Sequence, residues 1–228
     1  MKKENFSIKH LIILVFIILG FYLSGFFALI PINLFNMDAK NMSDSTNLLL
    51  SLFSNICFLG ILVLIYFKKL KEEFFIFKKD ISGNMDIAIK YWMGGLVLMA
   101  ASNLFLNFVL NLGQAENEEI VQSMIDASPY IMLISAGLIG PIIEELVFRR
   151  SFRDAFLNKW VFALSSGLVF GALHVVTLEP SLLEYLFIIP YSALGISFAL
   201  MYDKTKTVFT PIVMHIIHNS VLILLSFI

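Results

Sequence analysis

Seven stretches of about 20 mostly apolar residues recur along this chain, and each is long enough to cross a bilayer as a helix. Hydrophobic residues make up 59% of the 228 residues, whereas soluble domains are about 45–50% apolar. A soluble core of this size could not bury so much apolar surface. The sequence therefore predicts an all-α, polytopic transmembrane bundle of about seven spans in a cell membrane. The expected spans are Leu11–Ile32, Leu48–Phe67, Tyr91–Leu112, Pro129–Phe148, Trp160–Leu178, Glu184–Tyr202 and Val208–Ile228.

The basic residues indicate how these spans are oriented. Fifteen of the sixteen Lys and Arg residues lie in the N-terminal segment and in the second, fourth and sixth loops, and the exception is Lys40 in the first loop. Because cytoplasmic loops are enriched in Lys and Arg, the N-terminus is expected in the cytoplasm and the C-terminus outside. The Lys-rich stretch 68–90 is expected to be an amphipathic loop on the anionic inner leaflet. The first span is too long for a signal peptide and is interpreted as an uncleaved anchor.

Charge and cysteine content narrow the possible functions. The formal net charge is −1, so the chain lacks the basic excess of a nucleic-acid-binding protein. Its single cysteine, Cys57, lies in an apolar stretch, which excludes an intrachain disulfide and a thiolate metal cluster. The Lys-, Asn- and Ile-rich composition is typical of a low-GC bacterium. We therefore expect the protein to lie in a bacterial membrane and not to bind nucleic acid.

The fourth span carries charged residues where a transmembrane helix rarely has them. Glu144, Glu145 and Arg149 lie at its end, and charges in a bilayer usually face a partner or a cavity. Glu145 and Arg149 are four residues apart and share a helix face, so they are expected to form an ion pair. Glu144 points about 100° away and stays available for other work. Pro141 should free the carbonyl of Gly137, which favours a helix that lines a wet cavity.

Two later spans contribute imidazoles and an amide. His174 lies in the fifth span, and His215 and Asn219 lie four residues apart in the seventh. If the fourth helix continues to about Leu157, a hairpin turn near Asn158 brings Glu144 and His174 to the same depth. His215 can reach the same layer. A carboxylate, imidazoles and an amide together suit hydrolysis, because they can accept a proton from water, hold a metal and donate hydrogen bonds to an oxyanion.

Three motifs in this order resemble the CPBP family, which comprises CAAX proteases and bacteriocin-processing (Abi) enzymes related to the eukaryotic type II CAAX prenyl endopeptidase. The resemblance covers residues 131–224, with E-E-x-x-x-R beginning at Glu144, F-x-x-x-H ending at His174 and H-x-x-x-N beginning at His215. It implies an all-helical catalytic core, 129–228, preceded by N-terminal helices in 1–128. It also implies an active site inside the membrane that opens towards the cytoplasm.

The resemblance also implies roles for these residues. Glu144 would activate water, His174 would assist it or ligate a metal, and Glu145 and Arg149 would support them. Oxyanion binding, or completion of a metal site, would fall to His215 and Asn219. A zinc ion held by Glu144, His174 and His215 and a metal-free glutamate mechanism are both compatible with the family. His218 departs from the family pattern and could be a spare ligand or a packed neighbour, of which packing is the favoured interpretation.

The expected activity is therefore that of an intramembrane endopeptidase, a protease that cleaves a peptide or a membrane protein. Two other classes stay open. A non-catalytic bacteriocin immunity protein would carry the same motifs without cleaving anything. A proton-coupled transporter can use Glu and His relays, although no inverted repeat is visible and the first three spans hold few polar residues. A further alternative is that these polar residues only hold the helices together, but this does not explain why Glu144 has no expected partner.

Overall fold

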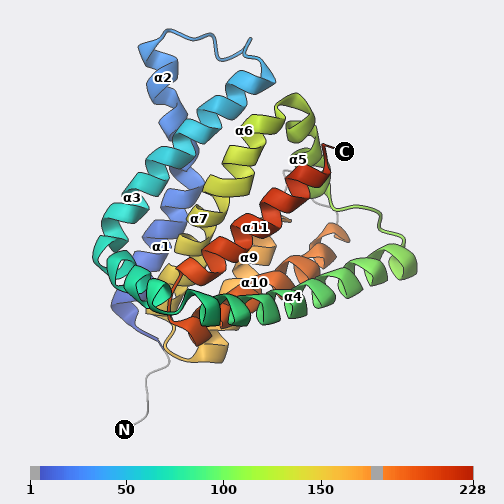
Figure 1. The fold of residues 1–228 in the computed structure, drawn as a ribbon. Coiled ribbons are helices and arrows are strands. Elements are labelled where there is room, and N and C mark those ends of the chain that lie inside the picture. The colour runs from blue at the N-terminus through green and yellow to red at the C-terminus, as the bar shows by residue number, and fades with distance from the viewer. Residues whose placement is uncertain (1–5, 176–181, 228) are drawn as a thin grey trace.

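The computed structural model describes residues 6–175 and 182–227 as a bundle of helices, with a single isolated β-bridge between Phe6 and Phe156 (Figure 1). Helix α1 begins at the end of the bundle opposite to the end where α11 finishes. The helices of the N-terminal half are α1 (Ile8–Leu23), η1 (Ser24–Ala28), α2 (Leu29–Leu34), α3 (Asp44–Lys79), α4 (Ile81–Leu110) and α5 (Glu116–Ala127). Those of the C-terminal half are α6 (Pro129–Ile134), η2 (Ser135–Ile139), α7 (Gly140–Glu144), η3 (Glu145–Ser151), α8 (Phe152–Ala155), α9 (Lys159–Leu173), η4 (Glu184–Phe187), α10 (Ile188–Thr205) and α11 (Phe209–Leu225).

The predicted class, a polytopic helical membrane protein, is confirmed. Five segments are long and apolar enough to cross a membrane, and they match the first four expected spans and the sixth. The other two are shorter than expected: α9 has 15 residues and α11 has 17. The expected fifth span continues to Leu178, but residues 176–178 lie outside the described part. Large apolar side chains stay exposed on the outside of the bundle, among them Leu64 and Phe108, as expected for surfaces that face lipid.

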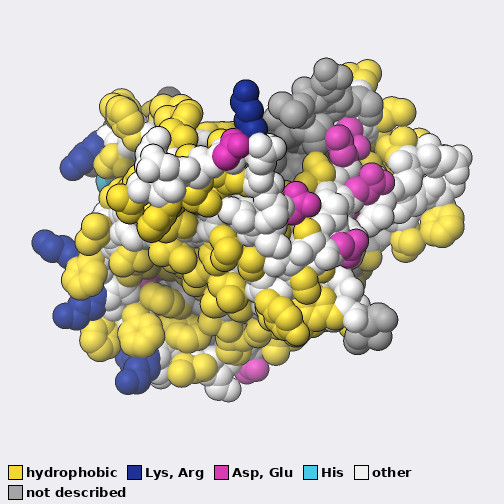
Figure 2. Space-filling model, turned by 90° about the horizontal axis from the view of Figure 1, so that it is seen from above, with side chains coloured by type: hydrophobic (Ala, Val, Ile, Leu, Met, Phe, Trp, Pro, Cys, Tyr) yellow, Lys and Arg dark blue, Asp and Glu magenta, His cyan; other side chains and the backbone are white. Residues whose placement is uncertain are grey.

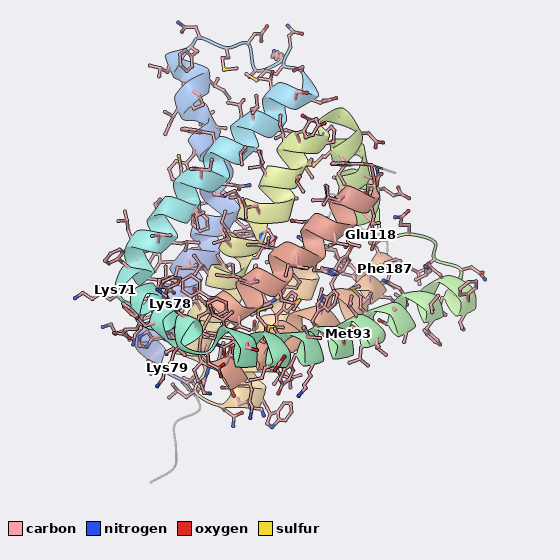
Figure 3. The ribbon with its side chains drawn as sticks, in the orientation of Figure 1. Lys71, Lys78, Lys79, Met93, Glu118 and Phe187 are labelled. Carbon is pink, nitrogen blue, oxygen red and sulfur yellow. The ribbon has the colours of Figure 1, made fainter. Side chains whose placement is uncertain are left out.

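The stretch 68–90, expected to be an amphipathic loop, is helical except for the break at Asp80, and its place on the inner leaflet stays a prediction. Helix α3 continues through this stretch to Lys79, the chain breaks only at Asp80, and α4 starts at Ile81. The Asp80 side chain accepts a hydrogen bond from the backbone N–H of Gly83 and so caps α4. Figure 3 places Lys71, Lys78 and Lys79 together at this end of the bundle. One residue between the lysines, Glu73, is buried in the protein.

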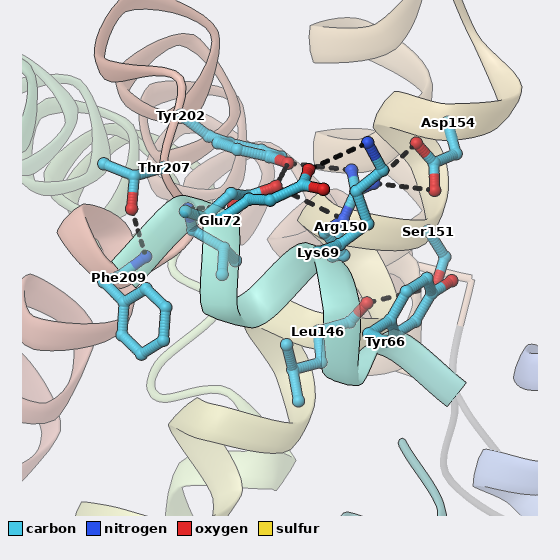
Figure 4. A network of polar contacts seen from close by, with 12 residues as sticks. Tyr66, Lys69, Glu72, Leu146, Arg150, Ser151, Asp154, Tyr202, Thr207 and Phe209 are labelled. Carbon is cyan, nitrogen blue, oxygen red and sulfur yellow. Dashed lines mark hydrogen bonds and ion pairs between the residues drawn. The ribbon is translucent and has the colours of Figure 1, made fainter. Parts of the chain in front are cut away.

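A buried polar network joins the N-terminal helices to the C-terminal ones. The Glu73 carboxylate of α3 accepts hydrogen bonds from the Tyr202 hydroxyl (2.8 Å) and from the backbone N–H of Val208 (2.7 Å), where α11 begins. Arg150 donates to the same hydroxyl and to both carboxylate oxygens of Asp154, as Figure 4 shows. Its Nε lies 3.3 Å from Glu73 Oε1. The network therefore fixes the start of α11 relative to α3 and η3.

Helices α9 and α10 pack so closely that only glycine fits between them. A Cβ at Gly171 would lie 2.8 Å from the backbone nitrogen of Ser192, and one at Gly195 would lie 3.1 Å from Gly167 Cα. Such small-residue contacts are typical of helix pairs in membranes. Gly171 lies one turn before His174, so this contact fixes the end of α9 that carries the histidine.

Candidate functional site

The helix that carries the two glutamates is irregular at both sides of them. Residues Ser135–Ile139 and Glu145–Ser151 have the wider π-helical hydrogen bonding, with a short α-helical turn between them. Glu144 ends that turn and Glu145 begins the second π-helical segment. Insertions of this kind are frequent at functional sites because they change the direction of neighbouring side chains. Here they place two adjacent glutamates in different surroundings.

Pro141 leaves backbone carbonyls without a partner in its own helix, and α11 satisfies them. The Asn219 side chain donates from Nδ2 to the Ala136 carbonyl (3.0 Å), and the Ser220 hydroxyl donates to the Gly137 carbonyl (3.2 Å). The prediction that Pro141 frees the Gly137 carbonyl is therefore consistent with the structure. Neighbouring helices commonly supply the missing hydrogen bonds at prolines in membrane proteins. As a result, α11 and α7 are held side by side at the level of the glutamates.

Glu145 is completely buried and has two partners. Its Oε2 lies 3.1 Å from Arg149 Nε, so the ion pair expected from the four-residue spacing is present, and both side chains are 0% exposed. Its Oε1 lies 3.0 Å from Nδ1 of His215. Because a carboxylate only accepts hydrogen bonds, Nδ1 of His215 carries the hydrogen. The Nε2 atom of His215 then lies on the other side of the ring, 3.6 Å from Oε2 of Glu144.

Further contacts hold Arg149 in place. Its Nη1 donates to the Ser166 hydroxyl (3.0 Å), which itself donates to the Phe148 carbonyl (2.6 Å). The guanidinium carbon lies 4.7 Å from the centroid of the Phe170 ring, within the range of a cation–π contact. Arg149 therefore ties η3 to α9 and neutralises Glu145 away from any opening. Sequence reasoning did not find Ser166, because a serine in a transmembrane helix has no motif of its own.

Glu144, in contrast, faces a cavity of about 560 Å³ together with His174, His215 and Asn219. Its side chain is 21% exposed. His174 donates from Nδ1 to the Phe170 carbonyl (2.8 Å), which leaves Nε2 as the free ring nitrogen. The Tyr191 ring stacks on His174 at a centroid distance of 5.0 Å. All four polar residues expected to work together thus line one cavity, and Glu145 and Arg149 lie behind it.

His218 also lines the cavity and accepts a 3.4 Å hydrogen bond at Nδ1 from the Trp92 ring nitrogen. That contact with α4 agrees with its interpretation as a packing residue. Among residues 6–175 and 182–227, no group of three His, Cys, Asp or Glu side chains is arranged to hold a metal ion. The proposed zinc ligands Glu144, His174 and His215 line one cavity but do not form such a group. These residues therefore do not fit a zinc ion in the arrangement described.

The cavity extends towards the end of the bundle that carries α5. Its outer lining includes Gln114 and Gln122, which are exposed, and it reaches Ser226 after the end of α11. The Lys-rich end of α3 lies away from this region (Figure 3). The cytoplasmic opening that the family resemblance implies stays a prediction.

Comparison with known proteins gives the same family as the motifs. Residues 126–221 match a family described as type II CAAX prenyl endopeptidase Rce1-like. A relative from Bacillus subtilis (strain 168), named "Putative membrane peptidase YdiL", is 29% identical over 226 residues, which cover 92% of this chain and 88% of the relative. UPF0177 protein YbdI from Lactococcus lactis subsp. lactis (strain IL1403) is 29% identical over 171 residues, covering 72% of this chain and 89% of the relative.

No solved structure matches the chain. The matched region contains all three motifs, from Glu144 to Asn219, and begins just before α6. At family level these matches support a membrane peptidase. Residues 126–221 of this multi-pass integral membrane protein are therefore similar to the Rce1-like family of type II CAAX prenyl endopeptidases.

Proposed function

We propose that this chain is an intramembrane endopeptidase that hydrolyses a peptide bond with a water molecule activated by Glu144. The observation that carries the proposal is the different surroundings of the two glutamates. Glu144 faces the cavity beside two imidazoles, whereas Glu145 is sealed behind it and neutralised by Arg149. Only Glu144 is therefore placed to accept a proton from a water molecule in the cavity.

The histidines have complementary roles in this proposal. His215 is oriented by Glu145 through Nδ1, and its Nε2 points towards Glu144. It can therefore hold the Glu144 carboxylate in position and donate a hydrogen bond once it takes up a proton. His174 lines the same cavity, and its Nε2 accepts a hydrogen bond while the ring is neutral. Once protonated, Nε2 can donate a hydrogen bond to the attacked carbonyl or a proton to the leaving amine. Each position is a side-chain atom that faces the cavity, as acid–base catalysis requires.

Asn219 fits a supporting role at the oxyanion. One of its amide hydrogens holds the Ala136 carbonyl, and the side chain still lines the cavity. The second amide hydrogen can then bind the negative oxygen of a tetrahedral intermediate. Loss of one donor of this kind lowers the rate by about 10²–10³-fold. The Ala136 contact also pre-orients the amide and helps to hold α11, so an Asn219→Ala variant is expected to lose stability as well as rate.

The experiment compares Glu144→Gln with Glu145→Gln in detergent-purified protein, using a panel of quenched fluorescent peptides. Gln keeps the shape of Glu but cannot accept the proton, so Glu144→Gln is expected to abolish cleavage while the melting temperature stays near that of the wild type. His174→Ala and His215→Ala are expected to lose cleavage as well. His10, which is paired with Ser7 outside the cavity, supplies the control His10→Ala, which is expected to retain activity.

Two results would contradict the proposal. If Glu144→Gln cleaves at the normal rate and Glu145→Gln does not cleave, the roles of the two glutamates are the reverse of those proposed. If both variants cleave at the normal rate, the proteolytic function is refuted. Metal analysis of the same preparation, and cleavage with and without a chelator, test the zinc ion separately. A chelator that stops cleavage, with zinc bound in a one-to-one ratio, would show that the ligands rearrange from the positions described.

A further inference from the structure

The catalytic residues occupy only the inner part of the cavity, and its outer part has no assigned role. Towards α5 the lining changes to side-chain amides and a single carboxylate, Glu118, which Figure 3 labels on this side of the molecule. The amides come from α4, from the loop after it and from α5. They are Asn103, Gln114, Asn117 and Gln122. A surface meant only to face lipid would not concentrate polar groups in this way.

Side-chain carboxamides can form hydrogen bonds with the backbone of a peptide. Each carries a donor and an acceptor, as each peptide group does, so a row of amides can bind an extended chain with little regard to its sequence. The 560 Å³ of the whole cavity is within the ~300–1,000 Å³ of ordinary ligand sites. That is enough for a few extended residues but is narrow for a helix, whose diameter with side chains is about 10–12 Å.

The Lys, Arg, Asp and Glu residues in the described lining of the cavity are all acidic. Glu118 lies at the outer part and Glu144 at the inner part, and the described lining contains no Lys or Arg. Figure 2 shows the same asymmetry on the surface: Asp and Glu side chains gather over one side, and most of the visible Lys and Arg side chains lie at the opposite edge. A cleft with carboxylates and no cations attracts positively charged ligands and repels acidic ones.

The outer part is also linked to the catalytic part. Asn117 of α5 donates from Nδ2 to the Tyr191 hydroxyl (3.4 Å), and the Tyr191 ring stacks on His174. A chain lying along α5 would therefore pass directly to His174 and Glu144. Helix α5 itself is anchored by Ile125, which is buried against α3, α6 and α11 side chains.

We propose that the outer part of the cavity binds an extended, basic peptide segment of the substrate, with the side-chain amides on its backbone and Glu118 near a cationic group. This names the substrate class for the peptidase proposed above and rests on that function. The cleaved bond would then lie next to a hydrophilic, positively charged segment that enters from the α5 end. A continuous transmembrane helix would not be the bound form.

The test measures binding, so that it does not depend on turnover. The full chain carrying Glu144→Gln is reconstituted in neutral-lipid nanodiscs, and the binding of fluorescein-labelled peptides is followed by anisotropy. The three peptides have equal length and contain Lys, Gln or Glu at the same positions. We expect the Lys peptide to bind about threefold to tenfold more tightly than the Glu peptide at low salt. In about 1 M salt, where the Debye length is about 3 Å, the difference should largely disappear.

Glu118→Lys should reverse the order of the Lys and Glu peptides. Glu119→Lys is the matched control, because Glu119 is the next residue on the same helix, is exposed and does not line the cavity. It should change each affinity by less than about twofold. Glu118→Gln, which adds no charge, should weaken the preference without reversing it and guards against misfolding of the lysine variant.

Several results would overturn the inference: equal affinity for the three peptides, no binding of any of them, or equal effects of Glu118→Lys and Glu119→Lys. The last would mean that general surface charge decides binding and not the cavity. These failures are distinct from failure of the proposed function, which is decided by turnover in protein with Glu144 intact. If Glu144→Gln abolishes cleavage but Glu118→Lys leaves the peptide order unchanged, only the substrate class is wrong.

Discussion

Removal of the Arg149 side chain should strongly destabilise the protein. Arg149 and Glu145 are both 0% exposed, and Nε and Oε2 lie 3.1 Å apart. Replacing Arg149 with Met keeps an unbranched apolar chain but leaves Glu145 buried with only His215 as partner. Loss of one partner of a buried ion pair costs about 3–5 kcal/mol. The Arg149 hydrogen bond to Ser166 is lost as well, so the upper part of that range is expected.

The assay is thermal unfolding in detergent, followed by tryptophan fluorescence. For a chain of this length, 1 kcal/mol shifts the melting temperature by about 2–4 °C, so 3–5 kcal/mol corresponds to about 6–20 °C. The double variant Glu145→Leu/Arg149→Met removes both charges and should recover most of that loss, because an apolar pair can replace a buried ion pair at little cost. Lys69→Met is the control, since its pair with Glu72 is exposed and worth about 1 kcal/mol or less.

Two outcomes would refute this reasoning. A melting temperature of Arg149→Met within about 2 °C of the wild type would mean that less than about 1 kcal/mol depends on the pair. A double variant as unstable as the sum of the two single variants would mean that Glu145 and Arg149 act independently. Either result would remove the reason for treating Glu145 as a supporting residue.

Two other predictions concern the buried Glu73 and the orientation of the chain in the membrane. Glu73→Ala should lower the melting temperature by several degrees and reduce peptide cleavage, because it frees the start of α11, whereas Glu72→Ala on the exposed face should do neither. Melting curves and initial rates of the two variants decide this, and equal behaviour would refute it. For topology, in a Cys57→Ser background, Gln114→Cys should react with a membrane-impermeant thiol reagent on intact cells and Lys79→Cys only after permeabilisation; the reverse pattern would show the opposite orientation.

The sequence predicts the membrane class and the grouping of the motif residues because both depend on simple regularities. Apolar length predicts spans, and five of the seven expected segments have the length of a span. The spacing of Glu145 and Arg149 predicts their ion pair because i,i+4 neighbours share a helix face. The depth argument that paired Glu144 with His174 is consistent with their position in one cavity. Each of these predictions can be made without knowing how the side chains pack.

Other features could not be predicted, because they depend on contacts between helices distant in sequence. The buried position of Glu73 within the Lys-rich stretch 68–90 has no local signal, because its partners Tyr202 and Val208 lie about 130 residues away. The part played by Asn117 and Tyr191 in lining the cavity has no motif either. The signal in the sequence is that α5 is polar in a strongly apolar chain.

Helix α11 shows how the fold fixes the site. Glu73 binds its first turn, Glu145 binds His215 in its middle, and Asn219 binds a carbonyl of η2 near its end. These three contacts come from three other segments, so the helix cannot slide or rotate without breaking at least one of them. The next residue, Ser220, binds the Gly137 carbonyl, which has no α-helical partner because Pro141 lacks an N–H. The proline that weakens one helix therefore helps to position the next, and with it the imidazole that faces Glu144.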